Sequence, residues 1–342
     1  MNAAAPAPAE SAGPGEFDLI RRYFVRENGP RRAALGIGDD CALLDAGAIA
    51  AEGSLAVSTD MLVAGRHFFD DVDPAALGHK ALAVNLSDLA AMGARPLGFT
   101  LAIALPQADA DWLARLAGGM FTLADAHGCE LIGGDTTRGP LNLSVTVFGT
   151  VPPAAALRRD RARAGDDLWV SGRLGAAAWA VAERQVAGRW IGDDAAIVHA
   201  RARLEWPQPR VALGLALRGV AGAAIDLSDG LAGDLVHLLD RSSAACGVRL
   251  GATLEAAALP VDDVLAAVPP ERARAFALGG GDDYELLFTA DPTRRDAVRA
   301  AGAALGLVLS RIGRIEPIEG VHLIDATGLS TPLNVRSFDH FR

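Results

Sequence analysis

Aspartates beside glycine or hydroxyl residues recur six times along the chain, and such carboxylates are candidates for chemistry. The six motifs are Gly36-Ile37-Gly38-Asp39-Asp40, Ser58-Thr59-Asp60, Leu86-Ser87-Asp88, Gly133-Gly134-Asp135-Thr136-Thr137, Asp226-Leu227-Ser228-Asp229-Gly230 and Gly280-Gly281-Asp282-Asp283. Any one of them could be a turn or a helix N-cap, because Asp and Ser accept hydrogen bonds from free amides and Gly adopts positive φ. Six together are harder to explain in that way. Since open α/β sheets bind ligands at their strand ends, we expect the motifs to cluster there.

The chemistry that fits these motifs best is the binding of magnesium and phosphate. Mg²⁺ prefers oxygen ligands and usually takes one or two carboxylates, while waters and phosphate oxygens complete its shell. The sequence has neither the Asp-x-Asp-x-Asp-Gly spacing of a calcium loop nor a His-Glu-x-x-His zinc motif. Glycine next to the aspartates lets a phosphate chain approach backbone amides at loops or helix starts.

Motifs for other catalytic and nucleotide-binding chemistries fail in this sequence. The run before Ser171 lacks the first glycine of a Gly-x-Ser-x-Gly nucleophile elbow. Gly36-Ile37-Gly38 continues as Asp39-Asp40-Cys41 and misses the last glycine of a dinucleotide fingerprint. The one lysine, Lys80, stands in Gly78-His79-Lys80-Ala81, which is no P-loop.

Length and composition indicate a soluble globular chain of about two domains, with 342 residues, 51% hydrophobic and 22% charged. The net charge of −10 disfavours nucleic acid as a partner, because a nucleic-acid groove needs a basic face. The most apolar region, 211–225, is broken by Arg218 and several glycines, so we expect no membrane span. Cys41, Cys129 and Cys246 form no Cys-x-x-Cys motif, which favours a reducing, cytoplasmic location.

The elements that must position the motifs alternate between strands and helices in the first half of the chain. We expect strands at 55–59, 97–105, 131–132 and 141–151, the first of them short and buried. Asp73-Pro74 predicts a helix start, with Asp as the N-cap and Pro at the first position. A second helix is expected at 109–127, ending before Gly128.

The alternation continues after a break at Pro152-Pro153. In the second half we expect strands at 167–170, into Asp226 and at 284–289, and helices at 174–185, at 209–217 and from Gly230. The sequence therefore predicts an α/β N-terminal domain over 16–152 and a second α/β domain over 153–342 that completes the site. Residues 1–15, rich in Ala and Pro and without the features of a signal peptide, are predicted to be a disordered tail.

Six stretches of the chain together resemble thiamine-monophosphate kinases, and the match runs in order from about Gly15 to Phe341. They include 36–44, 58–60, 80–94, 131–139, 224–231 and 281–286. This family belongs to the aminoimidazole-ribonucleotide synthetase-like superfamily. The resemblance implies two domains, α/β (α+β), with mixed sheets flanked by helices. It also implies ATP binding without a P-loop in the cleft between the domains, and a homodimer.

The resemblance also assigns roles to individual residues. Several Mg²⁺ ions would be held by Asp40, Ser58, Thr59, Asp60, Asp88, Asp135, Asp226 and Asp229. ATP would contact Gly134, Asp135, Arg159 and Ser228, and thiamine monophosphate would contact His67, Asp282 and Phe338. The family usually has Glu at the position of Asp282 and Trp or Tyr at that of Phe338. On composition alone, Arg159 would belong to a solvated basic stretch and His67 would be an ordinary polar residue, and the motif context favours the ligand roles.

The implied reaction is ATP-dependent phosphorylation of thiamine monophosphate to thiamine diphosphate, with ATP and Mg²⁺ as co-substrate and cofactor. No catalytic side chain is expected beyond those holding metal and phosphates, because a phosphate monoester with a second pKa near 6 is already largely ionised. Rival interpretations are another ATP-using superfamily member, such as aminoimidazole-ribonucleotide synthetase, and a non-catalytic Mg·nucleotide sensor. A selenophosphate synthetase or a hydrogenase maturation factor is disfavoured because each needs a reactive cysteine, near the start or at the C-terminus respectively. Only the thiamine-phosphate kinase would consume ATP strictly with thiamine monophosphate.

Overall fold

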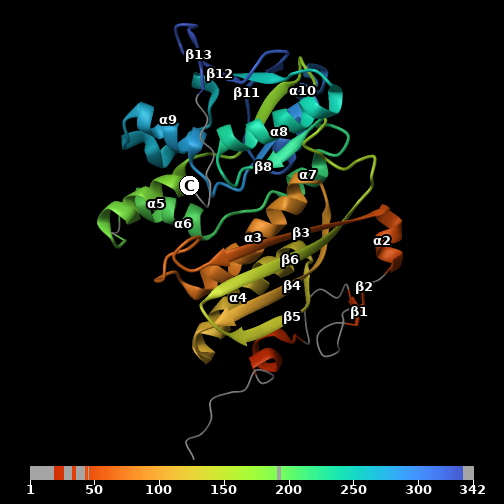
Figure 1. The fold of residues 1–342 in the computed structure, drawn as a ribbon, viewed down its shortest axis with the longest axis vertical. Helices are drawn as coiled ribbons and strands as arrows, with labels where there is room; N and C mark the ends of the chain where they lie inside the picture. Colours follow the sequence, from red (N-terminus) through yellow and green to blue (C-terminus); the bar gives the residue numbers. More distant parts are fainter. Residues whose placement is uncertain (1–18, 27–32, 36–42, 45, 191–193, 334–342) are drawn as a thin grey trace, which may run out of the picture.

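The described residues form two large β-sheets, each flanked by helices, and one two-stranded ladder, which confirms the expected fold class (Figure 1). The structure, a computed structural model, describes residues 19–26, 33–35, 43–44, 46–190 and 194–333. The first sheet comes from the N-terminal half and the second from the C-terminal half. The domain limits at 15/16 and 152/153 stay predictions. The second limit falls in the connection between the two sheets.

The first sheet has the strand order β3-β6-β4-β5. Its strands are β3 (Ser54–Val63), β4 (Arg95–Leu105), β5 (Glu130–Arg138) and β6 (Asn142–Val151). Neighbours are antiparallel except for β4 and β5, which are parallel. A small ladder of β1 (Ala33–Leu35) and β2 (Leu43–Leu44) lies beside β5, and α2 (Ala46–Glu52) leads into β3.

Helices α3 (Pro74–Ala91) and α4 (Ala110–His127) cover one face of this sheet (Figure 1). The predicted start of α3 is confirmed, since the Asp73 carboxylate accepts a hydrogen bond from the Ala75 amide at 2.7 Å and Pro74 follows it. The predicted end of α4 is also confirmed, at Gly128 with φ +60°. Almost every residue of α3 is buried, because the second half of the chain packs on it as well.

The second sheet has the strand order β13-β12-β9-β11-β7-β10-β8, and only the β9–β12 pair is parallel. Its strands are β7 (Asp167–Ser171), β8 (Ala224–Asp226), β9 (Gly251–Glu255), β10 (Leu286–Ala290), β11 (Leu309–Glu316), β12 (Val321–Ile324) and β13 (Ser330–Pro332). The remaining helices are α5 (Ala176–Ala187), α6 (Ala195–Glu205), α7 (Val211–Ala216), α8 (Leu231–Cys246), α9 (Pro270–Gly279) and α10 (Arg295–Ala304), with short turns of helix η1 (Ile20–Phe24), η2 (Ala256–Ala258), η3 (Asp263–Ala267) and η4 (Pro292–Arg294). Trp169 and Phe288 of this sheet join the core formed around α3, so the two halves share a continuous apolar interior.

Two expectations about the first sheet are wrong. The strand expected at 55–59 spans ten residues, and it is an edge strand whose Leu55 and Val57 are 41% and 54% exposed. Its inner side faces α3, whereas no helix of the described ranges covers its outer side (Figure 1). The motifs at 58–60 and 133–135 lie inside β3 and β5 rather than at strand ends, because long neighbouring strands continue the hydrogen-bonded ladder past them.

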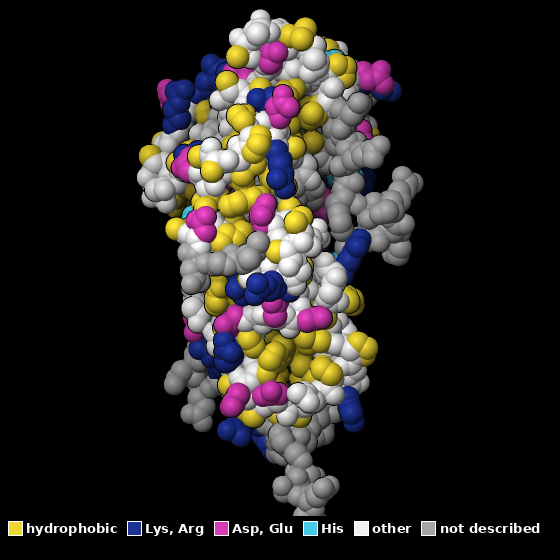
Figure 2. Space-filling model, turned by 90° about the vertical axis from the view of Figure 1, so that its left-hand side faces the viewer, with side chains coloured by type: hydrophobic (Ala, Val, Ile, Leu, Met, Phe, Trp, Pro, Cys, Tyr) yellow, Lys and Arg dark blue, Asp and Glu magenta, His cyan; other side chains and the backbone are white. Residues whose placement is uncertain are grey.

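Two observations bear on membrane and nucleic-acid binding by the described residues. None of the helices within the described ranges combines the length and apolarity needed to cross a membrane. On the face shown in Figure 2, basic side chains alternate with acidic and hydrophobic ones and form no continuous basic surface among the coloured residues.

Candidate active site

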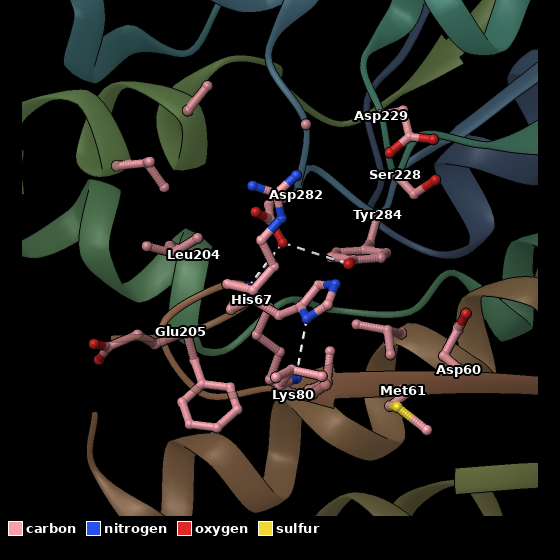
Figure 3. A pocket seen from close by; sticks show the side chains of 18 of the residues that line it. Asp60, Met61, His67, Lys80, Leu204, Glu205, Ser228, Asp229, Asp282 and Tyr284 are labelled. Atoms are coloured by element: carbon pink, nitrogen blue, oxygen red, sulfur yellow. Dashed lines mark hydrogen bonds and ion pairs between the residues drawn. The ribbon is translucent and has the colours of Figure 1, made fainter. Parts of the chain in front are cut away.

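A large cavity of about 1140 Å³ lies between the two halves of the protein. It is lined by β3 and α3 from the first half, by α5 and α6, and by the segments that follow β8 and precede β10. Figure 3 shows its labelled residues, with Asp60, Ser228 and Asp229 on one side and Leu204 and Glu205 on the other. Four of the six acidic motifs, those at 58–60, 86–88, 226–230 and 280–283, therefore meet at an interface between two sheets, rather than along the strand ends of one open sheet.

Four of the predicted aspartates converge at one end of the cavity. Asp60 comes from β3, Asp88 from α3, and Asp226 and Asp229 from the end of β8 and the turn after it. The Ser58 hydroxyl donates to Asp88 at 2.5 Å, and the Asp60 amide donates to the Asn85 side chain at 3.0 Å. These bonds fix β3 against α3, so that both carboxylates face the cavity.

The electrostatics of this acidic cluster disfavour several charged carboxylates in the absence of a cation. Burial, with the charges of Asp88 and Asp229, raises the pKa of Asp60 to about 6. Burial and the neighbouring Asp88 likewise raise the pKa of Asp226. Asp234, in the first turn of α8, accepts a hydrogen bond from the Asp229 amide at 3.1 Å, and burial raises its pKa to about 7. A divalent cation would relieve this repulsion.

The donor set fits Mg²⁺ that shares its shell with other ligands. Within the described ranges, no three acidic, His or Cys side chains converge closely enough to enclose a cation by themselves. The available donors are carboxylate and hydroxyl oxygens, the hard ligands that Mg²⁺ prefers, and Mg²⁺ normally keeps waters and phosphate oxygens. The cluster therefore suits a metal–phosphate complex better than a closed structural metal site.

Arginine side chains border the acidic cluster on its other side. Arg159 lines both the large cavity and a second hollow of about 410 Å³, which Arg158 and Arg241 also line. Its charge lowers the pKa of Asp88 against the dominant effect of burial, which places its guanidinium near the acids. Ser228 lies in the turn beside Asp229 and lines the large cavity. Asp88 and Asp160 also line the second hollow, and Arg158 is paired with Asp160, so basic and acidic side chains meet there.

The predicted substrate residues that the structure describes lie farther along the cavity. His67 accepts a hydrogen bond from the Val63 amide through Nδ1 at 3.0 Å. Asp282 forms an ion pair with Lys80, whose Nζ is 2.7 Å from Oδ1, and the Tyr284 hydroxyl donates to the same oxygen at 3.4 Å. Figure 3 draws these four side chains in the same part of the cavity.

Other predicted site residues lie elsewhere. Asp135 is exposed on β5, paired with the exposed Ala102, and it lines neither hollow. Gly134, with φ +150°, leaves room for β4, since a Cβ there would meet the Leu101 carbonyl oxygen at 1.9 Å. Thr59 is the exception, because it lines the large cavity, although its hydroxyl lies 2.8 Å from that of Thr146 on β6. Asp40 and Phe338 lie outside the described residues.

Sequence reasoning missed three residues of the cavity. Lys80 belongs to no P-loop, but the presence of one lysine among 32 basic residues is itself a signal. Asp234 had a weaker signal, an acid in the first turn of a helix that follows Gly230. Tyr284 lies in the stretch 281–286 that resembles the family, but its positive φ of 49° and that of Asp282, 67°, are properties of the folded loop.

Comparisons with known proteins agree with this geometry. Residues 38–151 match the family model "AIR synthase related protein, N-terminal domain". Thiamine-monophosphate kinase of Escherichia coli (strain K12) is 46% identical over 334 residues, covering 96% of this chain and 98% of the relative. That of Haemophilus influenzae is 37% identical over 333 residues, with the same coverage.

Solved structures extend the likeness to three dimensions. Thiamine-monophosphate kinase from Stenotrophomonas maltophilia K279a superposes with a TM-score of 0.79 at 49% identity, covering 85% of this chain and 91% of that one. A structure described as AaThiL complexed with AMPPCP and TMP gives 0.73 at 28% identity, covering 84% and 87%. Hydrogenase maturation protein HypE in complex with ATP shares the fold at 23% identity and a TM-score of 0.73, covering 95% and 96%.

The two-sheet fold and the cavity between its halves define an AIR synthase-related protein. Within that class, three thiamine-monophosphate kinases are 36% to 46% identical to this chain over nearly its full length. The chain belongs to the thiamine-monophosphate kinase family.

Proposed function

We propose that the protein transfers the γ-phosphoryl group of ATP to thiamine monophosphate, giving thiamine diphosphate and ADP. The observation that carries this proposal is the acidic cluster at one end of a cavity whose other end is lined by apolar side chains and the Lys80–Asp282 pair. One end suits phosphates with their cations, and the other suits a heterocycle. Family membership selects the substrate among those that such a cavity could accept.

The physical problem in this reaction is repulsion between two phosphate groups. Each pair of unit charges at about 4 Å costs about 4 kcal/mol at an effective dielectric of 20. Mg²⁺ held by the acidic cluster would supply the positive charge that offsets this repulsion. The chain itself contributes carboxylates that bind the cations, and Arg159 beside them as a further positive group. Because the acceptor phosphate is already ionised at neutral pH, no side chain needs to remove a proton.

Individual residues are assigned either to the metal ions and ATP or to thiamine monophosphate. We assign Asp40, Ser58, Thr59, Asp60, Asp88, Asp135, Asp226 and Asp229 to several Mg²⁺ ions, Gly134, Asp135, Arg159 and Ser228 to ATP, and His67, Asp282 and Phe338 to thiamine monophosphate. The convergence of Asp60, Asp88, Asp226 and Asp229 supports the metal assignment directly. Asp135 stands apart on the exposed side of β5. The assignments of Asp135 and Asp40 therefore rest on the resemblance to the family.

The functional unit is proposed to be a homodimer. On the outer side of β3, Leu55, Val57, Met61 and Val63 are 37–54% exposed and form a largely apolar strip along the edge of the sheet, with Thr59 between Val57 and Met61. Exposed apolar strips of this kind mark interaction surfaces, and an edge strand invites pairing. A second copy of the chain is the partner that would bury the same strip on both sides. We also propose a cytoplasmic location, where ATP is available.

The test is ADP release by the wild-type protein with ATP, Mg²⁺ and thiamine monophosphate, run beside free thiamine and formylglycinamidine ribonucleotide. Turnover with thiamine monophosphate alone, giving thiamine diphosphate, is the expected result. Turnover with only the purine intermediate would identify an aminoimidazole-ribonucleotide synthetase instead. ATP binding without turnover on any of the three would identify a nucleotide sensor.

A further inference from the structure

Lys80 occupies a position that no role described so far explains. It is the one lysine of the chain, it lies on the buried helix α3, and its side chain is only 4% exposed. Burying an ammonium is unfavourable unless its N–H groups are satisfied. The described residues provide partners for two of its three N–H groups, Asp282 Oδ1 at 2.7 Å and the His67 carbonyl oxygen at 3.5 Å. The third donor is left for something that enters the cavity, which Lys80 lines.

Asp282 offers the complementary group at the same place. Its Oδ1 accepts from Lys80 and from Tyr284, whereas Oδ2 accepts no hydrogen bond from the described residues. Its side chain is 32% exposed and lines the cavity beside Lys80 (Figure 3). A free donor and a free acceptor are thus held next to each other by their own ion pair. Such a pair matches a ligand edge on which an acceptor atom adjoins a donor group.

The backbone holds this pair rigidly. Asp282 and Tyr284 both have positive φ, a conformation that costs energy for residues other than glycine. The loop is fixed by the Asp282 amide, which donates to the Ser228 carbonyl at 2.9 Å, and by the Tyr284 amide, which donates to that of Leu227 at 2.8 Å. Strain kept in place by such bonds is typical of a preorganised binding site.

The position of Lys80 along α3 shows which part of a substrate it would meet. Lys80, Val84 and Asp88 lie one turn apart on the same side of the helix, and all three line the cavity. Eight residues of helix separate Lys80 from the acidic cluster at Asp88 by about 12 Å. A substrate whose phosphate lies at the acidic cluster would therefore pass the apolar Val84 and place its far end at Lys80.

We propose that Lys80 is a specificity-determining residue, which with Asp282 binds the amidine edge of the aminopyrimidine of the substrate. The Lys80 ammonium donates to the ring nitrogen, and Asp282 Oδ2 accepts from the adjacent exocyclic amine. This inference rests on the proposed function, because it takes thiamine monophosphate as the substrate. In that molecule the aminopyrimidine and the phosphate stand at opposite ends, as the spacing along α3 requires.

The experiment compares thiamine monophosphate with oxythiamine monophosphate, in which an oxo group replaces the exocyclic amine and reverses donor and acceptor. Wild-type kcat/KM should favour the amino substrate at least about tenfold, because a site built to pair with donors rejects an analogue that leaves them unpaired. Lys80→Met should raise KM for thiamine monophosphate at least about tenfold, with KM for ATP within about twofold. In Asp282→Asn, whose amide can donate to the oxo group, the preference should fall toward one. Arg295→Met, which removes a cation paired with buried Asp167 far from the cavity, should change neither KM.

Each other outcome would overturn the inference. Wild-type protein that turns over both substrates equally would show that nothing reads the amidine edge, and this measurement needs no variant to fold. Lys80→Met with an unchanged KM, or with an undiminished preference for the amino substrate, would remove Lys80 from recognition. If Lys80→Met lowered kcat/KM equally for thiamine monophosphate and for oxythiamine monophosphate, Lys80 would bind the phosphate that both molecules carry instead. Failure of the proposed function is a separate result, since wild-type protein would then release no ADP with thiamine monophosphate at all.

Discussion

The Ser87 hydroxyl donates a 2.8 Å hydrogen bond to the Asp226 carboxylate, and this bond joins α3 of the first half to β8 of the second. Both side chains are buried, so the bond is made without competition from water. It orients one acid of the cluster and at the same time docks the two halves that form the cavity.

We therefore expect Ser87→Ala to weaken Mg²⁺ binding. Groups that orient a metal ligand typically contribute 10–100-fold in affinity, so the Mg²⁺ concentration for half-maximal activity should rise by at least about tenfold. The matched control is Thr289→Ala, which also removes a buried hydroxyl, one that accepts a hydrogen bond from the Ala223 amide outside the cavity. An Mg²⁺ titration that is the same for both variants would contradict the orienting role of Ser87.

Asp60→Asn tests the acidic cluster itself. The amide keeps the shape of the side chain but removes the charge that would hold a cation, so turnover at ordinary Mg²⁺ should fall at least about a hundredfold. Asp240→Asn on the exposed side of α8 should leave turnover unchanged. Full activity of Asp60→Asn in a steady-state assay would remove Asp60 from the proposed ligand set.

Parts of the fold could be predicted from the sequence because their causes are local. Asp73-Pro74 and Gly128 mark the ends of α3 and α4 through cap chemistry that needs no distant partner. The exposure of β3 could not be predicted, since an apolar strand pattern is the same whether its outer side meets a helix or remains open. The course of β5 through Gly133-Gly134-Asp135 depends on pairing with β4, which is a tertiary contact.

The candidate site shows the same division. Residue type and neighbours pointed to Asp60, Asp88, Asp226 and Asp229, and the structure brings these four together. Sequence reasoning could not show that Asp135 faces away from them, because the direction of a side chain depends on the register of its strand. It also could not show that Lys80 meets Asp282, two residues 202 positions apart that only the docking of the two halves brings within 2.7 Å.

A buried charge network should make Arg210 important for stability. Glu285, only 1% exposed, accepts hydrogen bonds from Arg203 at 2.9 Å, from Arg210 and from Ser171, and these partners keep the pKa of Glu285 low despite its burial. Arg210→Met should lower the free energy of unfolding by about 3 kcal/mol, because it leaves a buried carboxylate partly unpaired. Chemical denaturation measures this. Arg249→Met, which breaks an exposed pair with Glu319, should cost no more than about 1 kcal/mol.

Stability should depend on pH through His79. Its Nε2 donates to the Pro207 carbonyl at 2.8 Å, and burial lowers the pKa of His79 below its usual value near 6.5. The unfolded chain therefore binds the proton more readily, and the contribution of neutral His79 to stability is present above about pH 6.5 and lost as the pH falls toward the folded-state value.

The variant His79→Gln isolates this contribution, since Gln can donate to the same carbonyl but does not titrate. Between pH 8 and pH 5, the free energy of unfolding should fall more for the wild type than for the variant. The difference between the two proteins is the informative quantity, because carboxyls with a raised pKa, such as Asp60, act in the opposite direction. Parallel curves would show that folding does not lower the pKa of His79.

The apolar strip on β3 gives the last prediction, which concerns the oligomeric state. Val57 is 54% exposed within the strip, and a charge there would be buried without a partner if a second copy covers it. Light scattering should give the wild type twice the chain mass of 35.3 kDa, and Val57→Lys the chain mass itself. Val198→Lys on α6, where the native residue is 53% exposed, should leave the dimer intact. A wild-type monomer, or a Val57→Lys dimer, would show that the strip does not join two copies.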